Sequence, residues 1–537
     1  MGAVERVTAS SPSTMVPPPT VAKVSPMKKA ARVMTGVGCE YALPPEHRAM
    51  MCLTDDHVLH VSTSHTTNPY VLGFMERLSR NKVIFKVNKC ALMDIKALYL
   101  NSPSIQVLNS SNLGLESHKE KLTYRQDDVV KLLRDAVELK ASDVHYIIGD
   151  QHCSIKFRVD GELTLYQEHL VSHGEELCAT IYQSMCDVAD PVYNPNRSQD
   201  ARLKRDFVRQ LGLFSARIAT RPTANGILMV LRLLYDRREE KTSLDILGFL
   251  PEQNAIIRRM WQRTTGINIF SGPTGSGKST TLEAVMSELL AEFNYTIHLL
   301  TFENPPEYVI AGANQTPIQC DMDDDEAISR EWARSIANGM RLDPDVMMVG
   351  EIRDLASAKA SFRAAMTGHG LWTTLHANDV TTILERLRDI GVDISLLTDP
   401  SLITGLINQN LMRKVCPKCR RPYLDHKSSL AEDLVERIEK TCQVENVFLR
   451  GIGCDDCNGT GISGRIIGAE VVMPTKRFMQ VFKNEGKNEA REYWVKEMQG
   501  ITKNQHMIRW INAGLVDPLL GERNVCALDE DLITLGL

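Results

Sequence analysis

The strongest chemical signal in this chain lies in residues 271–284, SGPTGSGKSTTLEA. Four of them, Gly272, Gly277, Lys278 and Ser279, occupy the fixed positions of a phosphate-binding loop. Glycines let backbone N–H groups turn toward phosphate oxygens, and the helix that follows adds the positive end of its dipole. The motif predicts that Lys278 reaches the β- and γ-phosphates of ATP and that the Ser279 hydroxyl holds Mg²⁺. The residues expected to bind the nucleotide are Gly272, Pro273, Thr274, Gly275, Ser276, Gly277, Lys278, Ser279 and Thr280.

Two acidic clusters follow this loop. In TFENPPEY, Glu303 comes directly after an apolar run, where a carboxylate can orient or deprotonate the water that attacks a nucleotide. In VGEIRD, Glu351 follows the short apolar run 346–349, where a second-strand acid meets Mg²⁺ or its water shell. The alternatives are a solvated turn for the first cluster and a strand cap for the second.

Two histidines flank a predicted strand in the segment 367–378, TGHGLWTTLHAN. His369 and His376 sit next to glycine and threonine, and side chains so placed can sense a γ-phosphate. Spacing alone does not separate this role from that of ordinary structural histidines.

Four cysteines form a C-x₂-C…C-x₂-C pattern of the kind that holds tetrahedral Zn²⁺. They are Cys416, Cys419, Cys454 and Cys457. A pair of disulfides is the alternative. The odd total of 13 cysteines favours free thiols in a reducing compartment.

The elements that position these residues fall into several predicted domains along the 537 residues. We expect a disordered leader over 1–40, a first N-terminal α+β domain over 41–115 and a second over 120–240. The loop-bearing domain spans 250–537 and includes a cysteine subdomain over 411–470. After the phosphate loop, strands and helices alternate, which predicts an α/β domain with a mainly parallel sheet. Strands are expected at 57–61, 82–87, 154–161, 215–220 and 226–235, and helices at 68–80, 90–100 and 127–139.

Composition excludes some classes of function. The net charge of −5 gives no basic footprint for nucleic acid. No apolar run is long enough to span a bilayer, and the first residues lack the apolar core of a secretory signal.

The order of these motifs resembles that of the secretion ATPase superfamily, most closely the branch that serves type II secretion and type IV pilus assembly. FENPPEY resembles its Asp box, VGEIRD its Walker B motif and TGHG…TLHAND its His box. The resemblance implies a RecA-like motor domain preceded by a PAS-like second N-terminal domain. It also implies that Glu303 is the general base and that Arg217 and Arg232 act on nucleotide phosphates.

The same resemblance implies a biological setting. It implies a cytoplasmic homo-hexamer, peripheral at the inner membrane, that acts on a polytopic inner-membrane platform protein through its N-terminal domain. ATP, Mg²⁺ and a structural Zn²⁺ are the implied cofactors, and no nucleic acid is bound. A pilus retraction motor, a DNA-translocating motor and a nucleotide-gated scaffold without useful turnover remain as alternatives.

Three positions depart from the family pattern. Asn304 replaces the usual aspartate of the Asp box, Ala377 replaces a threonine of the His box, and QNL replaces the usual QRL at 409–411. The change at Asn304 removes a negative charge near the metal, so slower turnover or altered metal preference is expected. We expect residues 409–411 to lie on a helix.

Overall fold

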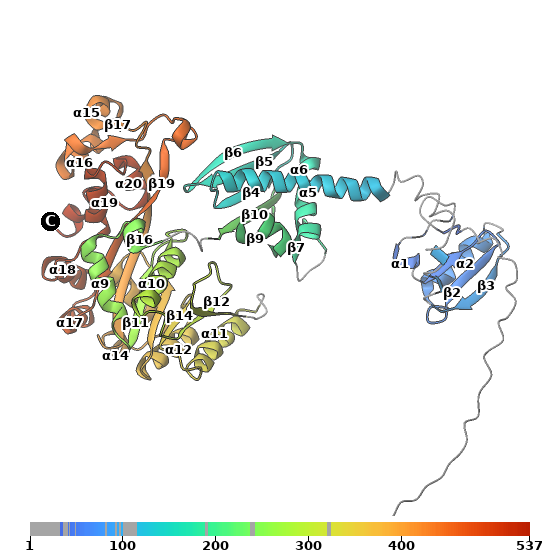
Figure 1. The fold of residues 1–537 in the computed structure, drawn as a ribbon, viewed down its shortest axis with the longest axis horizontal. Coiled ribbons are helices and arrows are strands. Elements are labelled where there is room, and N and C mark those ends of the chain that lie inside the picture. Colours follow the sequence, from blue (N-terminus) through green and yellow to red (C-terminus); the bar gives the residue numbers. More distant parts are fainter. Residues whose placement is uncertain are drawn as a thin grey trace, which may run out of the picture. The chain divides into compact units, whose positions relative to one another are not determined.

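The computed structural model describes residues 33–35, 41, 43, 45–48, 50–80, 83–91, 94–95, 98–99, 115–187, 192–236, 242–318 and 324–536 (Figure 1). The chain divides into two compact units, Met1–Tyr124 and Arg125–Leu537. Most of the leader predicted over 1–40 lies outside the described residues. Within that range Val33 is described, is buried, and forms a β-bridge with Thr54. Described structure therefore begins before residue 41.

The first unit contains a three-stranded sheet in the order β1-β2-β3. Its strands are β1 (Met51–Leu53), β2 (Val58–Ser62) and β3 (Lys86–Cys90), with β1 antiparallel and β3 parallel to β2. Helix α1 (Pro45–Arg48) precedes the sheet, and α2 (Pro69–Arg80) packs Phe74 and Leu78 against Leu59. The strand predicted at 82–87 begins later, at Lys86. Of the helix predicted over 90–100, the structure describes 90–91, 94–95 and 98–99; residue 90 ends β3, and 94–95 and 98–99 are helical.

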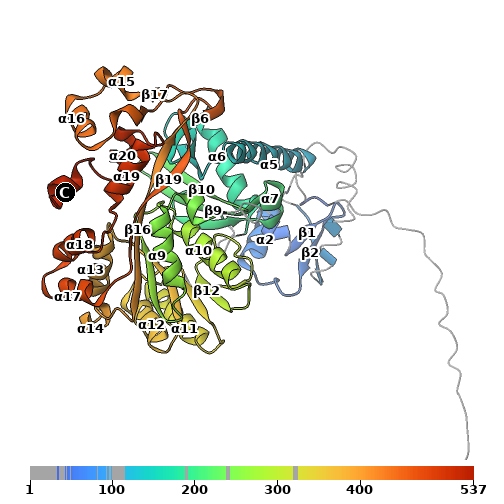
Figure 2. The same cartoon turned by 60° about the vertical axis from the view of Figure 1, so that its left-hand side comes forward.

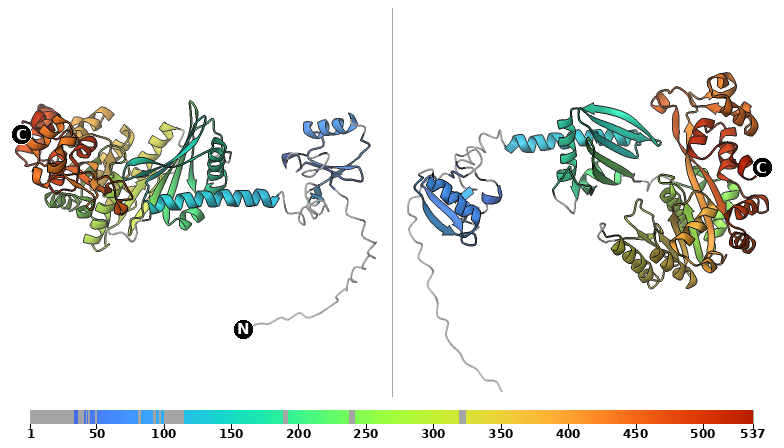
Figure 3. Two further views of the ribbon diagram at one scale, coloured as in Figure 1. Left: turned by 90° about the horizontal axis from the view of Figure 1, so that it is seen from above. Right: turned by 180° about the vertical axis from the view of Figure 1, so that it is seen from behind.

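A seven-stranded antiparallel sheet begins the second unit, in the order β6-β5-β4-β10-β9-β8-β7. Its strands are β4 (Asp143–Ile148), β5 (Cys153–Val159), β6 (Glu162–His169), β7 (Cys186–Asp187), β8 (Gln199–Leu203), β9 (Leu213–Thr223) and β10 (Gly226–Tyr235). Helices α5 (Leu115–Glu138) and α6 (Val171–Thr180), with the π-helical turn η1 (Ile181–Met185), cover one face, and α7 (Arg205–Gln210) lies between β8 and β9 (Figure 3). Alternate residues of β9, such as Ala216 and Ile218, are buried against these helices, so the intervening residues face away from them.

The opposite face of this sheet carries a row of charged side chains. Arg202 on β8 pairs in register with Arg217 on β9, and Arg217 pairs with Arg232 on β10. Arg232 pairs in turn with Asp143 on β4, which also lies opposite Arg158 on β5. Residues directly opposite on antiparallel strands share a face, so these four arginines flank a single carboxylate.

The second sheet of this unit is mainly parallel, which confirms the predicted α/β fold (Figure 2). Its order is β13-β12-β14-β15-β11-β16-β19, and only β19 runs antiparallel to its neighbour, β16. The strands are β11 (Gly266–Ser271), β12 (Leu299–Glu303), β13 (Ala313–Pro317), β14 (Val346–Val349), β15 (Gly370–Leu375), β16 (Ile403–Val415) and β19 (Ile462–Val472).

Helices cover both faces of the parallel sheet. On one face lie α8 (Leu244–Leu247), α9 (Pro251–Trp261) and α10 (Lys278–Glu292). On the other lie α11 (Asp325–Gly339), α12 (Leu355–Met366), α13 (Val380–Ile390) and α14 (Ile394–Leu397). Every residue of β11 and of β15 is buried, as expected for strands with helices on both sides.

The C-terminal third completes this unit. Helices α17 (Lys476–Asn484) and α18 (Lys487–Lys496) pack on the face with α13, and α19 (Lys503–Asn512), α20 (Pro518–Asn524) and α21 (Glu530–Thr534) follow. The cysteine subdomain adds β17 (Arg421–Pro422), β18 (Phe448–Leu449), α15 (Tyr423–His426) and α16 (Glu432–Thr441). Residues 409–411 lie on strand β16, so the predicted helix there is wrong. Among the described residues, no helix combines the length and apolarity needed to cross a membrane.

Candidate nucleotide site and cysteine cluster

The predicted phosphate loop and three of the predicted side chains lie at one edge of the parallel sheet. The loop follows β11, and Glu303 is the last residue of β12. Glu351 comes just after β14, and His376 comes directly after β15. Because β12, β14, β15 and β11 are parallel neighbours, their carboxyl ends meet there, the edge at which open α/β sheets bind ligands.

Backbone geometry makes residues 272–277 a cradle for phosphate. Gly272, Gly275 and Gly277 have φ angles of 146°, 77° and 84°. A Cβ at Gly272 would lie 2.2 Å from the carbonyl oxygen of Gln409, so only glycine fits there. The Ser276 hydroxyl is buried and has no partner among the described residues, which fits a loop shaped to bind an anion.

Lys278 begins α10 and points back into this loop. Its Nζ donates to the carbonyl oxygens of Gly272, at 2.8 Å, and of Pro273, at 3.2 Å. Burial lowers the pKa of Lys278, while the carboxylates of Glu351 and Glu307 oppose that shift. The ammonium is therefore partly desolvated and close to acidic groups, as expected for a lysine that binds phosphate.

Two buried amide side chains of β16, Asn408 and Gln409, bind the phosphate loop and its neighbours. Their role at the site was not predicted from the sequence. Gln409 Nε2 donates to the Ser276 carbonyl oxygen at 2.8 Å. Asn408 Nδ2 donates to Ser271 Oγ and to the Ala377 carbonyl oxygen, both at 2.9 Å. Both side chains are fully buried. Consecutive amides inside an apolar strand are the signal that could have identified them.

Glu303 has the surroundings of a partly desolvated base. Its Oε1 accepts hydrogen bonds from Thr301 Oγ1 at 2.6 Å and from Gln315 Nε2 at 2.9 Å. Burial raises the pKa of Glu303, and the two hydrogen bonds only partly oppose that shift. A carboxylate with a raised pKa at a nucleotide edge can accept a proton near neutral pH.

Glu351 contacts two side chains, those of Arg353 and His376. Its Oε2 accepts from Arg353 Nε at 2.8 Å, and His376 Nε2 lies 3.3 Å from its Oε1. The predicted Walker B acid and one predicted histidine are thus in direct contact.

The other predicted histidine, His369, lies elsewhere. It precedes the first residue of β15, and its carbonyl oxygen accepts from the backbone N–H of Gly266 at the start of β11. A six-residue strand separates the two histidines by roughly 20 Å. Contrary to the expectation of a histidine pair at the phosphates, only His376 lies at the nucleotide edge of its own chain.

The two predicted arginines differ in their contacts. Arg217 Nη2 donates to the Pro305 carbonyl oxygen at 3.0 Å and lies 3.6 Å from Glu307 Oε1, beside the segment after β12. Burial lowers the pKa of Arg217, and Glu307 opposes the shift. Arg232 instead donates to Asp143 Oδ1 at 2.9 Å within its own sheet and is half-exposed. The structure therefore brings Arg217, and not Arg232, into contact with the parallel-sheet domain.

The four predicted cysteines come together as one cluster. Their sulfur atoms all lie within 4.8 Å of one another. The Sγ atoms of Cys416 and Cys454 are 3.7 Å apart, and those of Cys419 and Cys457 are 3.9 Å apart. Four sulfurs at about 2.3 Å from a tetrahedral Zn²⁺ would be about 3.8 Å apart, whereas a disulfide needs about 2.05 Å. The spacing fits a metal site rather than two disulfides.

Backbone donors favour the thiolate form of one cysteine of this cluster, Cys457. The N–H groups of Cys454, at 3.2 Å, and of Gly461, at 3.1 Å, point at Cys457 Sγ. Burial alone would raise the pKa of Cys457, but these N–H groups, together with the side chains of Cys454 and Cys419, lower it to about 6. A thiolate is the form that binds a metal.

The cysteine subdomain also contacts the β5–β6 hairpin of the antiparallel sheet. Glu162 accepts two hydrogen bonds from the Arg450 guanidinium, at 2.7 and 2.9 Å, and Arg413 Nη1 lies 3.5 Å away. At the hairpin turn, Asp160 Oδ2 accepts from the N–H of Gly464 at 3.1 Å. These contacts link the turn to the chain on both sides of the cysteine cluster.

Comparison with known proteins gives consistent matches. The family model described as "Type II/IV secretion system protein" matches residues 119–516. The chain is 31% identical over 411 residues to the type II secretion system ATPase E of Vibrio cholerae, covering 73% of this chain and 77% of that protein. It is 28% identical over 497 residues to the type IV pilus assembly ATPase PilB of Acinetobacter baylyi, covering 86% and 82% respectively. A crystal structure of the pilus retraction motor PilT with bound ADP has a TM-score of 0.47 and 21% identity, covering 74% of this chain and 96% of that chain.

Proposed function

Because the chain belongs to the Type II/IV secretion system protein family and is therefore a P-loop ATPase, we propose that it powers assembly of a type IV pilus or a type II secretion pseudopilus. The observation that carries this proposal is the meeting of the phosphate loop, Glu303, Glu351 and His376 at one sheet edge, with Arg217 contacting the segment beside them. This arrangement suits hydrolysis coupled to movement of the two sheets of the second unit. The alternative of a scaffold without turnover is disfavoured because the general-base position keeps its glutamate.

Each side chain at this edge has a proposed role. Backbone N–H groups of the loop and Lys278 bind the phosphates of ATP, and Ser279 and Glu351 hold Mg²⁺ directly or through water. Glu303 accepts the proton of the attacking water. His376, against Glu351, senses the γ-phosphate. Mg²⁺ held there would supply positive charge against the phosphates.

The proposed role of the arginines follows from their positions. Arg217 reaches the segment after β12 and is the arginine best placed to neutralise charge during phosphoryl transfer. Arg232 lies beside it in register, and it takes part once its bond to Asp143 is exchanged for phosphate. His369 has no proposed role at the phosphates, since it lies at the other end of β15.

We propose that the four-cysteine cluster holds a structural Zn²⁺. All four ligand positions are filled by protein sulfur, which leaves none open for catalysis. The ion would fix the loops that carry Arg450 and Gly464, and hence the surface that meets the β5–β6 hairpin.

The proposed assembly is a homo-hexamer in the cytoplasm, peripheral at the inner membrane. It would act on a polytopic inner-membrane platform protein, with the first unit contacting membrane partners. Support comes from family membership and from the names of the relatives, which are secretion and assembly ATPases. Those names favour assembly over the retraction alternative. The acidic net charge of −5 disfavours a DNA motor.

The test is Lys278→Ala in the organism that encodes this protein, with surface filaments and secreted proteins measured together. Loss of filaments identifies an extension motor, and normal filaments with retained exoproteins identify a secretion motor. Excess filaments would overturn the proposal in favour of retraction. Lys359→Ala, an exposed lysine of α12, is the matched control and should change neither measurement.

A further inference from the structure

Residues 376–379, which we term the His376 loop, connect β15 to α13 and carry the histidine that contacts Glu351. The loop has no regular secondary structure, so groups outside it must fix its path. One such group has been described: Asn408 binds the carbonyl oxygen of Ala377. Two further contacts, at and just after the end of the loop, come from segments at least ninety positions away in the sequence, near the C-terminus.

Two further anchors meet at Glu470 on β19. Lys503, the first residue of α19, donates through its Nζ to the carbonyl oxygen of Asn378. The backbone N–H of Val380, which begins α13, donates to Glu470 Oε2 at 3.2 Å, and the N–H of Lys503 donates to Oε1 at 3.3 Å. The end of the His376 loop and the start of α19 are therefore tied to one carboxylate.

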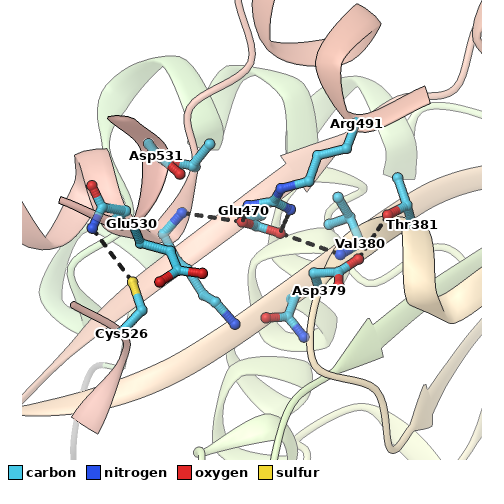
Figure 4. Close-up of polar contacts among 12 residues, drawn as sticks. Asp379, Val380, Thr381, Glu470, Arg491, Cys526, Glu530 and Asp531 are labelled. Carbon is cyan, nitrogen blue, oxygen red and sulfur yellow. Dashed lines mark hydrogen bonds and ion pairs between the residues drawn. The ribbon is translucent and has the colours of Figure 1, made fainter. Parts of the chain in front are cut away.

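Arg491 on α18 completes this arrangement, and Figure 4 shows it facing Glu470. Its Nη2 and Nη1 donate to the two carboxylate oxygens at 2.6 and 3.1 Å. Glu470 is fully buried, and the guanidinium and the two backbone N–H groups replace the hydrogen bonds that its carboxylate would otherwise make with water. Removing the guanidinium leaves an uncompensated buried carboxylate, which must seek other donors.

Other charged groups face the pair. Asp379 caps α13 through Thr382 and lies near Arg491, and Asp531 on α21 accepts from Thr502. The negative charges of these acids attract the Arg491 guanidinium. Asp379 is also the last residue of the His376 loop. The ion pair is thus continuous with the loop.

We propose that Glu470 and Arg491 are positioning residues for ATP hydrolysis, acting by holding the His376 loop so that His376 meets Glu351. The bidentate pair fixes the position of the Glu470 carboxylate, which binds the backbone N–H of Val380 at the start of α13. Lys503 binds the carbonyl oxygen of Asn378, two residues after His376. Among the described residues, the polar partners of this pair lie outside the phosphate loop. This inference rests on the proposed role of His376 and extends it to the C-terminal helices.

The test is a double-mutant cycle on the full chain. Arg491→Lys keeps the charge but cannot make both hydrogen bonds in the same plane, so the loop should shift while the fold survives. We expect kcat for phosphate release to fall about tenfold while the affinity for a fluorescent ATP analogue changes less than twofold. In a His376→Ala background, Arg491→Lys should cause no further loss, because its effect passes through that imidazole.

The matched control is Arg437→Lys. Arg437 on α16 of the cysteine subdomain makes a bidentate pair with Glu522 on α20, at 2.7 and 2.9 Å. It should lower the melting temperature and leave kcat unchanged. Glu470→Gln is a second variant, which should reproduce the kinetic loss because the neutral amide no longer neutralises Arg491.

The outcomes separate the two ideas. If His376→Ala leaves kcat unchanged, the proposed role of His376 fails and the positioning role fails with it. If His376→Ala lowers kcat but Arg491→Lys adds its full effect on top, only the positioning role is overturned. Equal kinetic loss in Arg437→Lys would also overturn it, since general destabilisation would then explain the result.

Discussion

Replacing Glu303 with glutamine separates its chemistry from its contribution to the fold. The hydrogen bonds that Thr301 and Gln315 donate to this side chain end on the same oxygen, Oε1. The carbonyl oxygen of glutamine can accept both, so the variant keeps the local structure. What it loses is the ability to accept a proton. A general base contributes about 10²- to 10⁴-fold, so kcat should fall by that factor, or about 3–5 kcal/mol of barrier.

The stability of Glu303→Gln should move in the opposite direction. Because burial raises the pKa of Glu303, the folded protein binds this proton more tightly than the unfolded chain does. The ionised carboxylate therefore destabilises the fold at pH above the raised pKa, and this cost disappears as pH falls through it. Neutral glutamine removes the cost, worth about 1.4 kcal/mol for each unit of pKa shift. At neutral pH the variant should melt at the same temperature as the natural protein or higher.

Three measurements check this prediction: steady-state phosphate release, ATP-analogue affinity and thermal melting. The kcat of the natural protein should fall as pH drops through the raised pKa of Glu303, and the variant should lack that limb. The control is Glu331→Gln on α11, whose carboxylate contacts Ser335 and Arg334 away from the site. A loss of kcat below tenfold, or a melting temperature several degrees lower, would refute the reasoning.

Three further predictions follow from the site. Gly272→Ala places a Cβ 2.2 Å from the Gln409 carbonyl oxygen, so nucleotide binding measured by fluorescence titration should be abolished; retained affinity would mean that the loop is not held by β16. His376→Ala should lower kcat at least tenfold more than His369→Ala, and equal losses would place both imidazoles at the phosphates. Purified protein should contain about one zinc per chain by mass spectrometry, and Cys457→Ser should lower that content and the melting temperature together.

The nucleotide edge could be predicted because its chemistry is local in sequence. An apolar run followed by a glycine-rich loop predicts β11 and the phosphate loop. An apolar run followed by an acid predicts β12 with Glu303 and β14 with Glu351. The tetracysteine cluster was predictable for the same reason, since spacing within each C-x₂-C pair fixes the local geometry. Parallel pairing then brings these loops to one edge without further information.

The remaining features depend on contacts that sequence spacing does not encode. Gln409 meets the phosphate loop across 133 positions, and a helix predicted at that segment placed it wrongly. The two histidines look equivalent in the sequence, but they lie at opposite ends of β15 because a strand extends about 3.3 Å for every residue. Arg491 is only 21 positions from Glu470, yet the bidentate pair forms because α18 packs back beside α13.

The hairpin contact at Glu162 couples metal binding at the cysteine cluster to the arrangement of the antiparallel sheet and the cysteine subdomain. Arg450, which grips that carboxylate, lies four positions before Cys454, and Gly464 follows Cys457 by seven. Coupling free energies are reciprocal, so a metal that orders these loops must strengthen the hairpin contact by the same factor by which the contact raises the affinity of the cluster for the metal. The amount of metal retained in the presence of a chelator would then differ between nucleotide states if the hairpin contact does. It would report the arrangement of the two sheets from a site that takes no part in the chemistry.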